Sequence, residues 1–342
     1  MNGIKVPLKE AQSTKEILRG NNLLDNEKII IKEKAHIFYP VNDFSRLKKI
    51  LPECKPVQKN FKKKKMPKTL KAAIEKKLNA KERGVLKKSF DVVGTIAILE
   101  VGKGLEKKEK LLAETLMRIN PRIKTVLKKE GGHIGIFRQQ KMKFLAGENK
   151  KETIHRENNV QLKLNVETVY FSSRLSSERK RIAGLVKPNE KILVMFSGAG
   201  PYVCVIAKNT KVKEVVGIEI NPEAHMYATE NLILNKIKNA ILYLGDVKKI
   251  IPKLNEKFDR IVMPLPKSAG DFLDAAFDAA KKGTIIHFYD FLDENDIPKS
   301  AIEKIENACK RNNLKCKVLS WVKCGQSAPR VYRVCVDFRT EN

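Results

Sequence analysis

The chain has few cysteines and no cysteine pair at metal-binding spacing. Its six cysteines include no C-x2-C pair and have no histidine at zinc-ligand distance along the chain. The pattern therefore predicts no metal site. Reduced thiols are usual in a cytosolic protein, and a Cys309–Cys316 disulfide stays open as an alternative for a hyperthermophilic source.

Long apolar runs are also lacking. No run reaches the roughly 18 consecutive apolar residues that a membrane span needs, and the opening MNGIKVPLKEAQ has no apolar region typical of a signal peptide. We therefore expect a cytoplasmic protein that contacts no membrane. Its length of 342 residues favours two or three domains, at about 100–200 residues each.

Acidic residues are scarce relative to basic ones. The chain has 69 Lys and Arg against 39 Asp and Glu, a formal net charge of +30. In a free globular protein, repulsion between so many like charges destabilises the fold. Genome bias or heat adaptation is the alternative, but heat adaptation enriches Lys and Glu together. Because the acids do not keep pace, the charge predicts a nucleic-acid partner.

Composition and periodicity divide the chain into three domains. Residues 1–55 hold one amphipathic helix, LKEAQSTKEILRGNNLL, and short strand-like pieces, as in a small α+β domain. Residues 56–67 are basic and bear prolines, which predicts a linker. Residues 68–160 combine helices such as EKLLAETLMRI with one strong strand, SFDVVGTIAILEV, and indicate a second α+β domain.

The linker carries four consecutive lysines, Lys62, Lys63, Lys64 and Lys65. Such a run can be a solubilising tether or a strap on a phosphate backbone. In a chain this positive we favour the second interpretation, so the four lysines are candidate RNA contacts.

The apolar pattern changes in residues 161–342. KILVMFS, EVVGIEI, AILYLGD, FDRIVMPLP and GTIIHFYDF are near-continuous apolar runs of strand length, separated by helix-like segments. Buried parallel strands have this pattern, which predicts an α/β fold with a doubly wound sheet. The last apolar segments, KVLSWVKC and VYRVCVDF, predict a closing hairpin.

Candidate ligand-binding residues follow these strands, where open α/β sheets bind ligands. The first strand leads into FSGAGP, in which Gly198 and Gly200 let the backbone approach a ligand. The third glycine of a dinucleotide fingerprint is missing, and a plain tight turn is the alternative. Glu219 ends the second strand, where it can accept both hydroxyls of a ribose, and Asp246 follows the third, near an adenine.

Either acid could instead cap the next helix. The FSGAGP turn, Glu219 and Asp246 each follow one of three successive strands, and MPLPK, with Pro264 and Pro266, comes after the next strand. This order favours S-adenosylmethionine over NAD as the cofactor.

Several longer segments carry a family resemblance. SFDVVG, FRQQKMKFLAGEN, TIHREN, VYFSSRLSSERKRI, MFSGAGP, IEINPEA, PLPKSAGDF and SAPRVY occur in this order, and together they resemble the archaeal and eukaryotic tRNA guanine-37 N1-methyltransferases over nearly the whole chain. The resemblance implies an N-terminal domain that reaches the tRNA elbow, a middle RNA-binding domain, and a Rossmann-like class I methyltransferase domain that binds S-adenosylmethionine. We expect a monomer.

The resemblance also implies catalytic residues. Guanine N1 carries a proton that must leave as the methyl arrives, so the site needs a base near N1 and a cation for the charge on O6. By resemblance Glu178 is the general base and Arg138 the group that holds O6. A helix-start acid paired with Arg174 or Arg181 is the alternative for Glu178.

Further site residues follow from the same resemblance. It places Tyr170 and Arg174 beside the cofactor or the target base, and gives Phe196 and the turn from Gly198 to Gly200 backbone contacts with the cofactor. The resemblance also implies that Arg330, in the segment SAPR, contacts the anticodon loop. An ordinary hairpin turn is the alternative for that segment.

Pro264 departs from the family pattern. The family reads Asn-Leu-Pro-Tyr or Asn-Leu-Pro-Lys where this chain reads Pro-Leu-Pro-Lys, and proline has neither a polar side chain nor an N–H group. An archaeal branch with such a change also methylates carbon 7 of 4-demethylwyosine to give isowyosine, so we favour a bifunctional enzyme. A monofunctional N1-methyltransferase is the first alternative, and a non-catalytic tRNA-binding protein and a DNA or protein N-methyltransferase are the others.

Overall fold

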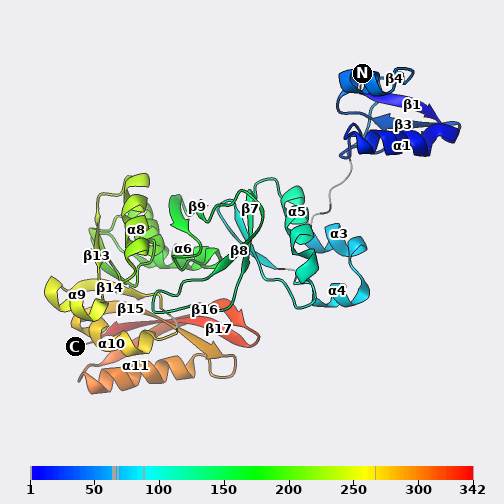
Figure 1. Ribbon diagram of the computed structural model, residues 1–342. Coiled ribbons are helices and arrows are strands. Elements are labelled where there is room, and N and C mark those ends of the chain that lie inside the picture. Colours follow the sequence, from blue (N-terminus) through cyan, green and yellow to red (C-terminus); the bar gives the residue numbers. More distant parts are fainter. Residues whose placement is uncertain (1, 64–66, 68, 88, 266, 342) are drawn as a thin grey trace. The chain divides into compact units, whose positions relative to one another are not determined.

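The computed structural model describes residues 2–63, 67, 69–87, 89–265 and 267–341. Over these residues the chain forms two compact units, which divide between Ala73 and Ile74. Figure 1 labels their helices and strands. Each unit has a hydrophobic core of its own.

The first unit is a four-stranded antiparallel sheet with two helices. Its strands stand in the order β2–β3–β1–β4, with the bounds β1 (Gly3–Pro7), β2 (Ile31–Glu33), β3 (His36–Pro40) and β4 (Lys55–Val57). The predicted amphipathic helix is α1 (Ala11–Gly20), after a 3-10 turn, η1 (Leu8–Glu10). Helix α2 (Phe44–Ile50) is capped by Asp43, whose carboxylate accepts a hydrogen bond of 2.9 Å from the Arg46 amide.

The segment after β4 packs on this first unit. The side chain of Asn2 exchanges two hydrogen bonds with the backbone of Lys59, and the Ile29 amide donates to the Lys62 carbonyl at 2.9 Å. Phe61 is 6 % exposed. The structure thus places residues 55–63 in the first unit, whereas the sequence pattern assigned 56–67 to a linker. The buried ring of Phe61 and these hydrogen bonds attach residues 55–63 to the first unit, although their composition is typical of a solvated linker.

The second unit begins with short helices and a four-stranded sheet in the order β5–β6–β7–β8. The elements are α3 (Leu70–Ile74), which spans the division between the units, η2 (Glu75–Lys77), α4 (Ala80–Val85), β5 (Phe90–Val93), β6 (Ile96–Leu99), η3 (Glu106–Lys108), α5 (Glu109–Ile119), β7 (Thr125–Lys129) and β8 (Met142–Gly147). The segment SFDVVGTIAILEV, predicted as one strand, is the β5–β6 hairpin. Gly94 turns the chain there with a φ of 55°.

The next hairpin lies against helix α8. It consists of β9 (Glu152–Glu157) and β10 (Val160–Asn165), and α8 spans Pro222–Leu234. Asn231 hydrogen-bonds both the amide and the carbonyl of Lys163, and Asn235 does the same for Gln161. The predicted domain limit at 160 therefore falls inside a hairpin that packs on α8, a helix of the C-terminal region. One buried cluster continues from Val93 and Leu127 into that region.

The C-terminal sheet has seven strands in the order β13–β12–β11–β14–β15–β17–β16. The first five run parallel, and β17 pairs antiparallel with both neighbours. The bounds are β11 (Lys191–Met195), β12 (Glu214–Glu219), β13 (Ala240–Leu244), β14 (Phe258–Met263), β15 (Ala280–Asp293), β16 (Cys316–Ala328) and β17 (Val331–Thr340). The predicted strands and closing hairpin are thus confirmed.

Helices cover both faces of this sheet (Figure 1). Ile192 and Val194 pack with α6 (Ser176–Leu185), α7 (Pro201–Asn209) and α8, while Leu193 and Met195 pack with α9 (Val247–Leu254), α10 (Leu273–Asp278) and α11 (Lys299–Arg311). Successive side chains of a strand point to opposite faces of the sheet. A strand that is apolar at every position therefore has to be packed against helices on both faces. The doubly wound α/β fold is confirmed.

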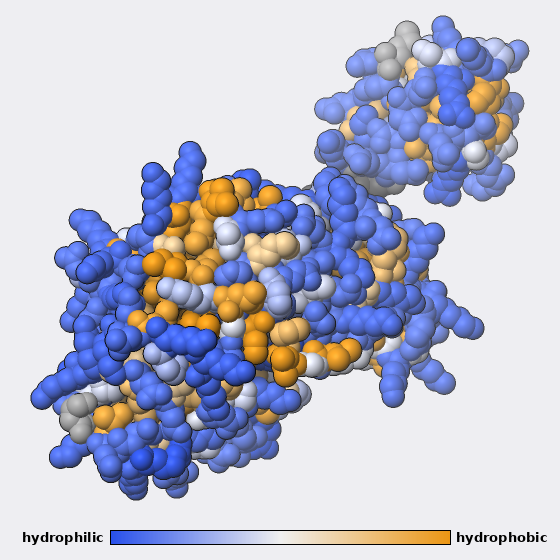
Figure 2. Space-filling model, turned by 60° about the vertical axis from the view of Figure 1, so that its left-hand side comes forward, coloured by the Kyte–Doolittle hydropathy of each residue, from blue (hydrophilic) through white to orange (hydrophobic). Residues whose placement is uncertain are grey.

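Exposed apolar side chains gather on the face that carries α8 and the edge strand β13 (Figure 2). Met226, Ile233, Ile241 and Leu244 are each more than a third exposed. These side chains offer no charge to a phosphate backbone. In the part of the chain that the structure describes, no helix has the length and apolar character needed to cross a membrane.

Candidate active site

Glycines and a buried hydroxyl shape the loop after β11. Gly200 has a φ of 77°, and a Cβ there would lie 3.3 Å from the Cβ of Ala228 in α8, so glycine lets α7 and α8 approach. At Gly198 the nearest atom to an added Cβ is the Tyr170 carbonyl oxygen, 3.8 Å away. The hydroxyl of Ser197 is buried without a hydrogen-bond partner, which is uncommon in proteins. The open space at Gly198 fits a ligand such as S-adenosylmethionine, whereas the Ser197 hydroxyl lies in the interior, near Gly217 of β12.

Glu219, at the end of β12, faces this loop. Its Oε2 accepts a hydrogen bond of 2.6 Å from the Gly198 amide, and its Oε1 accepts one of 2.8 Å from the Asn221 amide. Burial raises the pKa of the carboxyl above its usual value, against the effect of these amides. The Ile220 amide also lowers the pKa, and since a carboxylate has about four acceptor positions, the group can still accept a hydrogen bond from a ribose. Asn221 caps α8, so Glu219 is not needed as the helix cap.

The next strands of the sheet bring two more predicted residues to the same edge. Asp246 follows β13, and its carboxylate caps α9 by accepting a hydrogen bond of 2.9 Å from the Lys248 amide. The cap alternative therefore describes part of its role. Pro264 follows β14 and is half-buried. Pro266 lies outside the described residues. Because β13, β12, β11 and β14 are neighbours, the segments that follow them meet at one edge.

Tyr170 joins three parts of the second unit. Its carbonyl lies beside Gly198, and its ring packs under the guanidinium of Arg138, 4.4 Å from the ring centroid. The edge of His133 contacts the same ring, with 5.2 Å between centroids. The Tyr170 hydroxyl accepts a hydrogen bond of 2.9 Å from Arg333 in β17. One tyrosine thus connects the loop before β8, the glycine loop and the C-terminal hairpin.

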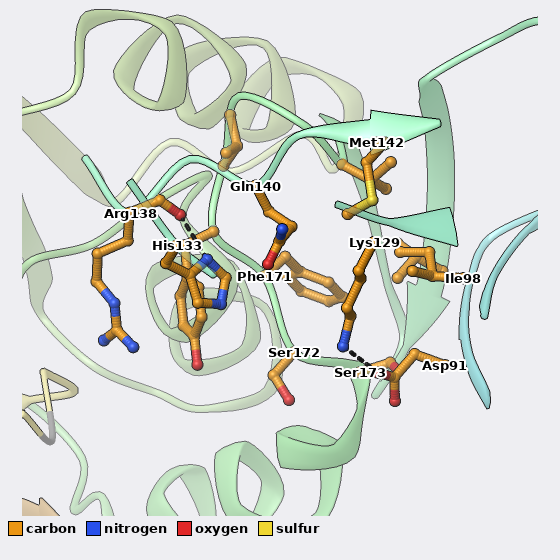
Figure 3. Close-up of a pocket in the computed structure, with 14 residues that line it drawn as sticks. Asp91, Ile98, Lys129, His133, Arg138, Gln140, Met142, Phe171, Ser172 and Ser173 are labelled. Carbon is orange, nitrogen blue, oxygen red and sulfur yellow. Dashed lines mark hydrogen bonds and ion pairs between the residues drawn. The ribbon is translucent and has the colours of Figure 1, made fainter. Parts of the chain in front are cut away.

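A pocket lies between the β5–β8 sheet and the segment that leads into α6 (Figure 3). Arg138 and His133 stand at one end, and Lys129 and Asp91 face each other at the other. Its volume of about 140 Å³ is smaller than the roughly 300–1,000 Å³ of a complete ligand site. The pocket can therefore hold only part of a substrate such as a nucleotide.

Three predicted site residues have left-handed backbone. Among the described residues that are not glycine, ten have positive φ, and six of these are asparagine, which tolerates that conformation. The other four are Arg138, Phe196, Lys236 and Arg330. Such strain costs about 1–3 kcal/mol per residue and gathers at functional sites. Its concentration at Arg138, Phe196 and Arg330 supports their assignment to a site.

Glu178 is buried in the first turn of α6, with 4 % of its surface exposed. Arg181 donates two hydrogen bonds of 2.8 Å, one to each carboxylate oxygen. The Tyr289 hydroxyl donates to Oε1 at 2.6 Å. The Glu178 carboxylate therefore pairs with Arg181, as expected for a helix-start acid paired with an arginine. Unlike an ordinary surface pair, this carboxylate is buried. One acceptor position of Oε2 remains for a proton.

Arg181 extends this contact into a buried network. Its Nη1 also donates to Asp337 at 2.6 Å, and Asp337 hydrogen-bonds His287 at 2.6 Å. Arg260 lies 2.8 Å from the other ring nitrogen of His287. His287 and Asp337, together with Cys335, are close enough to share a metal ion. Because two guanidinium groups already contact these side chains, hydrogen bonding accounts for the cluster.

Strand alternation links Glu178 to the surroundings of Tyr170. In the β15–β17 ladder Tyr289 stands opposite Cys335, and Phe291 stands opposite Arg333. Tyr289, which contacts Glu178, and Phe291 are two residues apart and share a face of the sheet. The sequence pattern missed Arg333, although polar residues at every second position of VYRVCVDF were a signal for it.

The remaining predicted residues lie further out. The Arg174 side chain is 60 % exposed and pairs with Asp91 at 2.6 Å on the rim of the pocket. Arg330 lies in the β16–β17 turn with a 64 % exposed side chain. Lys62 and Lys63 are exposed in the first unit. Lys64 and Lys65 lie outside the described residues.

Comparison with known proteins matches two family descriptions to the second unit. Residues 153–319 match the TRM5/TYW2 methyltransferase domain, and residues 70–150 match the TYW2 N-terminal domain. The chain is 34% identical over 337 residues to the tRNA (guanine(37)-N(1))-methyltransferase Trm5b of Pyrococcus abyssi, covering 98% of both chains.

A second relative is named for two substrates. The tRNA (guanine(37)-N(1))/4-demethylwyosine(37)-methyltransferase Taw22 of Nanoarchaeum equitans is 33% identical over 300 residues, covering 73% of this chain and 98% of that protein.

Two solved structures are similar along the chain. The complex of aTrm5 with tRNALeu superposes with a TM-score of 0.73 at 33% identity and covers 100% of both chains. The structure of Methanocaldococcus jannaschii TYW2 with AdoMet superposes with a TM-score of 0.57 at 28% identity, covering 74% of this chain and 100% of that one.

Proposed function

The chain belongs to the TRM5/TYW2 methyltransferase family, and on that basis we propose that it transfers a methyl group from S-adenosylmethionine to the base at position 37 of tRNA. The first substrate is guanine, methylated at N1. The observation that carries the proposal is the position of Tyr170, whose ring contacts the Arg138 guanidinium and whose carbonyl lies beside the glycine loop. When bound, S-adenosylmethionine supplies an activated methyl group on a sulfonium centre.

Residues at the carboxyl ends of β11, β12 and β13 would hold the cofactor. The glycine loop and Phe196 would give it backbone contacts, and Glu219 would accept hydrogen bonds from the ribose hydroxyls. Asp246, after the following strand, would contact the adenine. Tyr170 and Arg174 would contact the cofactor or the target base.

The reaction needs a base for the proton on guanine N1, and we assign this role to Glu178. Arg181 donates one hydrogen bond to each oxygen of its carboxylate. Three hydrogen bonds fix the orientation of the group, so the free position on Oε2 is the one that takes the proton. The N1 proton would move to this oxygen as the methyl group leaves the sulfonium sulfur for N1, with S-adenosylhomocysteine as the leaving group.

Arg138 balances the charge that develops on guanine O6. Its side chain takes part in no ion pair in the described portion of the chain, and it lies over an aromatic ring. A guanidinium without a carboxylate partner keeps its donors for substrate. The Tyr170 ring beneath it limits the positions of the guanidinium, and a preorganised cation favours electrostatic stabilisation of the transition state.

A second substrate is favoured by Pro264. We propose that the chain also methylates carbon 7 of 4-demethylwyosine at position 37. Without an asparagine side chain at position 264, the site has one fewer polar group committed to a guanine edge, and a larger ring can enter. The match of residues 70–150 to the TYW2 N-terminal domain and the likeness to Taw22 support this proposal.

The remaining contacts with tRNA are also proposals. The first unit binds the tRNA elbow, Lys62 and Lys63 contact the phosphate backbone, and Arg330 contacts the anticodon loop. We propose a monomer that acts in the cytoplasm. Light scattering of the purified protein is expected to give a mass near the 38.9 kDa of one chain, and a dimer mass would contradict the monomer.

Methylation at position 37 is tested with matched tRNA transcripts. The purified protein is incubated with S-adenosylmethionine and a transcript that has guanosine at position 37, and the nucleosides are analysed by mass spectrometry. The control transcript has adenosine at that position. We expect 1-methylguanosine from the first transcript alone, and equal methylation of both transcripts would contradict the assignment.

A further inference from the structure

Three arginine side chains are more than nine-tenths buried in the described portion of the chain, and their partners differ. Arg179 donates two hydrogen bonds to the Glu157 carboxylate, and Arg260 donates two to Glu190. Arg333, which is 7 % exposed, forms no ion pair with any residue that the structure describes. It is the exception among the three.

Only part of the Arg333 guanidinium is hydrogen-bonded. Its Nη2 donates to the Tyr170 hydroxyl at 2.9 Å, and its Nε is buried with no partner. Its charge lies over the ring of Phe291, 5.1 Å from the centroid. Glu178 lies in the same region, but Arg181 and Tyr289 already hydrogen-bond its oxygens.

An unpaired buried charge is unfavourable unless a partner arrives. Arg333 stands near the start of β17, opposite Phe291 and so near the carboxyl end of β15. Ligands of such sheets bind at that edge. Through Tyr170, the guanidinium is connected to both Arg138 and the glycine loop. The missing partner is therefore expected among the groups of a bound ligand.

We propose that Arg333 and the Tyr170 hydroxyl form a binding site for an oxyanion of a ligand. A guanidinium offers two parallel donors that suit a carboxylate or a phosphate. The oxyanion is either a phosphodiester of the RNA or the carboxylate of the methyl donor. The inference rests on the proposed function, because that function brings both groups to this edge.

Thermal unfolding of the ligand-free protein tests whether Arg333 lacks a partner. Arg333→Met removes a buried charge that has no counter-ion, so we expect a Tm equal to or above that of the wild type. The matched variant Arg260→Met breaks a paired contact and is expected to lower the Tm. A comparable fall in Arg333→Met would mean that the protein itself satisfies the guanidinium, and would overturn the proposal.

Binding measurements then identify the oxyanion. Arg333→Met is compared with the wild type and with Arg339→Met, which removes an exposed charge from the same strand. The ligands are the tRNA transcript, S-adenosylhomocysteine, and 5′-methylthioadenosine, which lacks the carboxylate. Loss of a hydrogen-bonded charge pair is expected to weaken binding of one ligand at least about tenfold.

If the site takes a phosphodiester, the Kd for tRNA rises in Arg333→Met, the salt dependence of binding falls by about one ion, and S-adenosylhomocysteine binds as before. If it takes the carboxylate, S-adenosylhomocysteine binds more weakly while 5′-methylthioadenosine and tRNA are unaffected. Unchanged binding of all three ligands would overturn the proposal. The wild type would still methylate tRNA in that case, so failure of the oxyanion site is distinguishable from failure of the proposed function.

Discussion

Replacement of Glu178 by glutamine separates its chemical role from its structural one. The amide is nearly the same size as the carboxylate and keeps one oxygen for Tyr289 and Arg181. It lacks the charge and the free acceptor position on Oε2. The variant therefore keeps most of the packing around α6 and loses the group that takes the N1 proton.

The magnitudes of the two effects differ. Loss of a general base lowers a rate by about 10²–10⁴-fold, which is about 2.7–5.4 kcal/mol in activation free energy. One of the two hydrogen bonds from Arg181 to Glu178 is lost in the variant, and a hydrogen bond to a charged group contributes about 1.5–3 kcal/mol to stability. A protein with about 5–15 kcal/mol of stability stays folded, so we expect a slow but folded enzyme.

Single-turnover methylation of a tRNA with guanosine at position 37, measured across pH, is the assay. We expect Glu178→Gln to be at least about a hundredfold slower near neutral pH, with unchanged affinity for S-adenosylhomocysteine. The defect should shrink as pH rises, because solvent then removes the N1 proton. A rate within about threefold of the wild type at neutral pH would refute the base role. A defect that does not change with pH would indicate that Glu178 acts by positioning alone.

Three other variants test neighbouring parts of the site. Arg138→Ala is expected to slow guanine N1 methylation about 10²–10³-fold with cofactor binding retained, measured by the same assay and by calorimetry; near-normal rates would contradict its role. Tyr289→Phe removes one donor to Glu178 and is expected to lower the unfolding free energy by about 1–2 kcal/mol, measured by urea denaturation, where equal midpoints would count against the contact. Burial alone would raise the pKa of Asp337, but its contacts with His287 and the Arg181 guanidinium lower this pKa overall. A carboxyl whose pKa is lower in the folded than in the unfolded protein stabilises the fold above about pH 4, and this stability is lost in stronger acid. Asp337→Asn should therefore be less stable at neutral pH and lose less of its remaining stability on acidification, and a parallel acid dependence would contradict this.

The sequence predicted the C-terminal sheet well because its strands are buried on both faces. KILVMFS and EVVGIEI gave β11 and β12 by their apolar runs alone. The β5–β6 hairpin was missed because its two strands are separated by only two residues, and the turn at Gly94 looks like part of one apolar run. The packing of residues 55–63 was missed because it depends on Phe61, in a segment whose charge suggested a linker.

The site was partly visible in the sequence. The glycine loop and Glu219 follow from strand order, and their hydrogen bond is a local contact between neighbouring strands. Of the partners of Glu178, Arg181 was expected because it lies one helical turn away, whereas Tyr289 was not predictable because it lies 111 residues further along the chain. Positive φ at Arg138 and Phe196 was hidden as well, since neither residue type favours that conformation.

We propose methyl transfer to position 37 of tRNA by a site that accepts two bases. The most direct measurement incubates the wild type with S-adenosylmethionine and two tRNAs, one with guanosine and one with 4-demethylwyosine at position 37, and analyses the nucleosides by mass spectrometry. We predict 1-methylguanosine from the first and isowyosine from the second. Methylation of guanosine alone would make Pro264 a tolerated substitution in a monofunctional enzyme, and methylation of neither base would contradict the account.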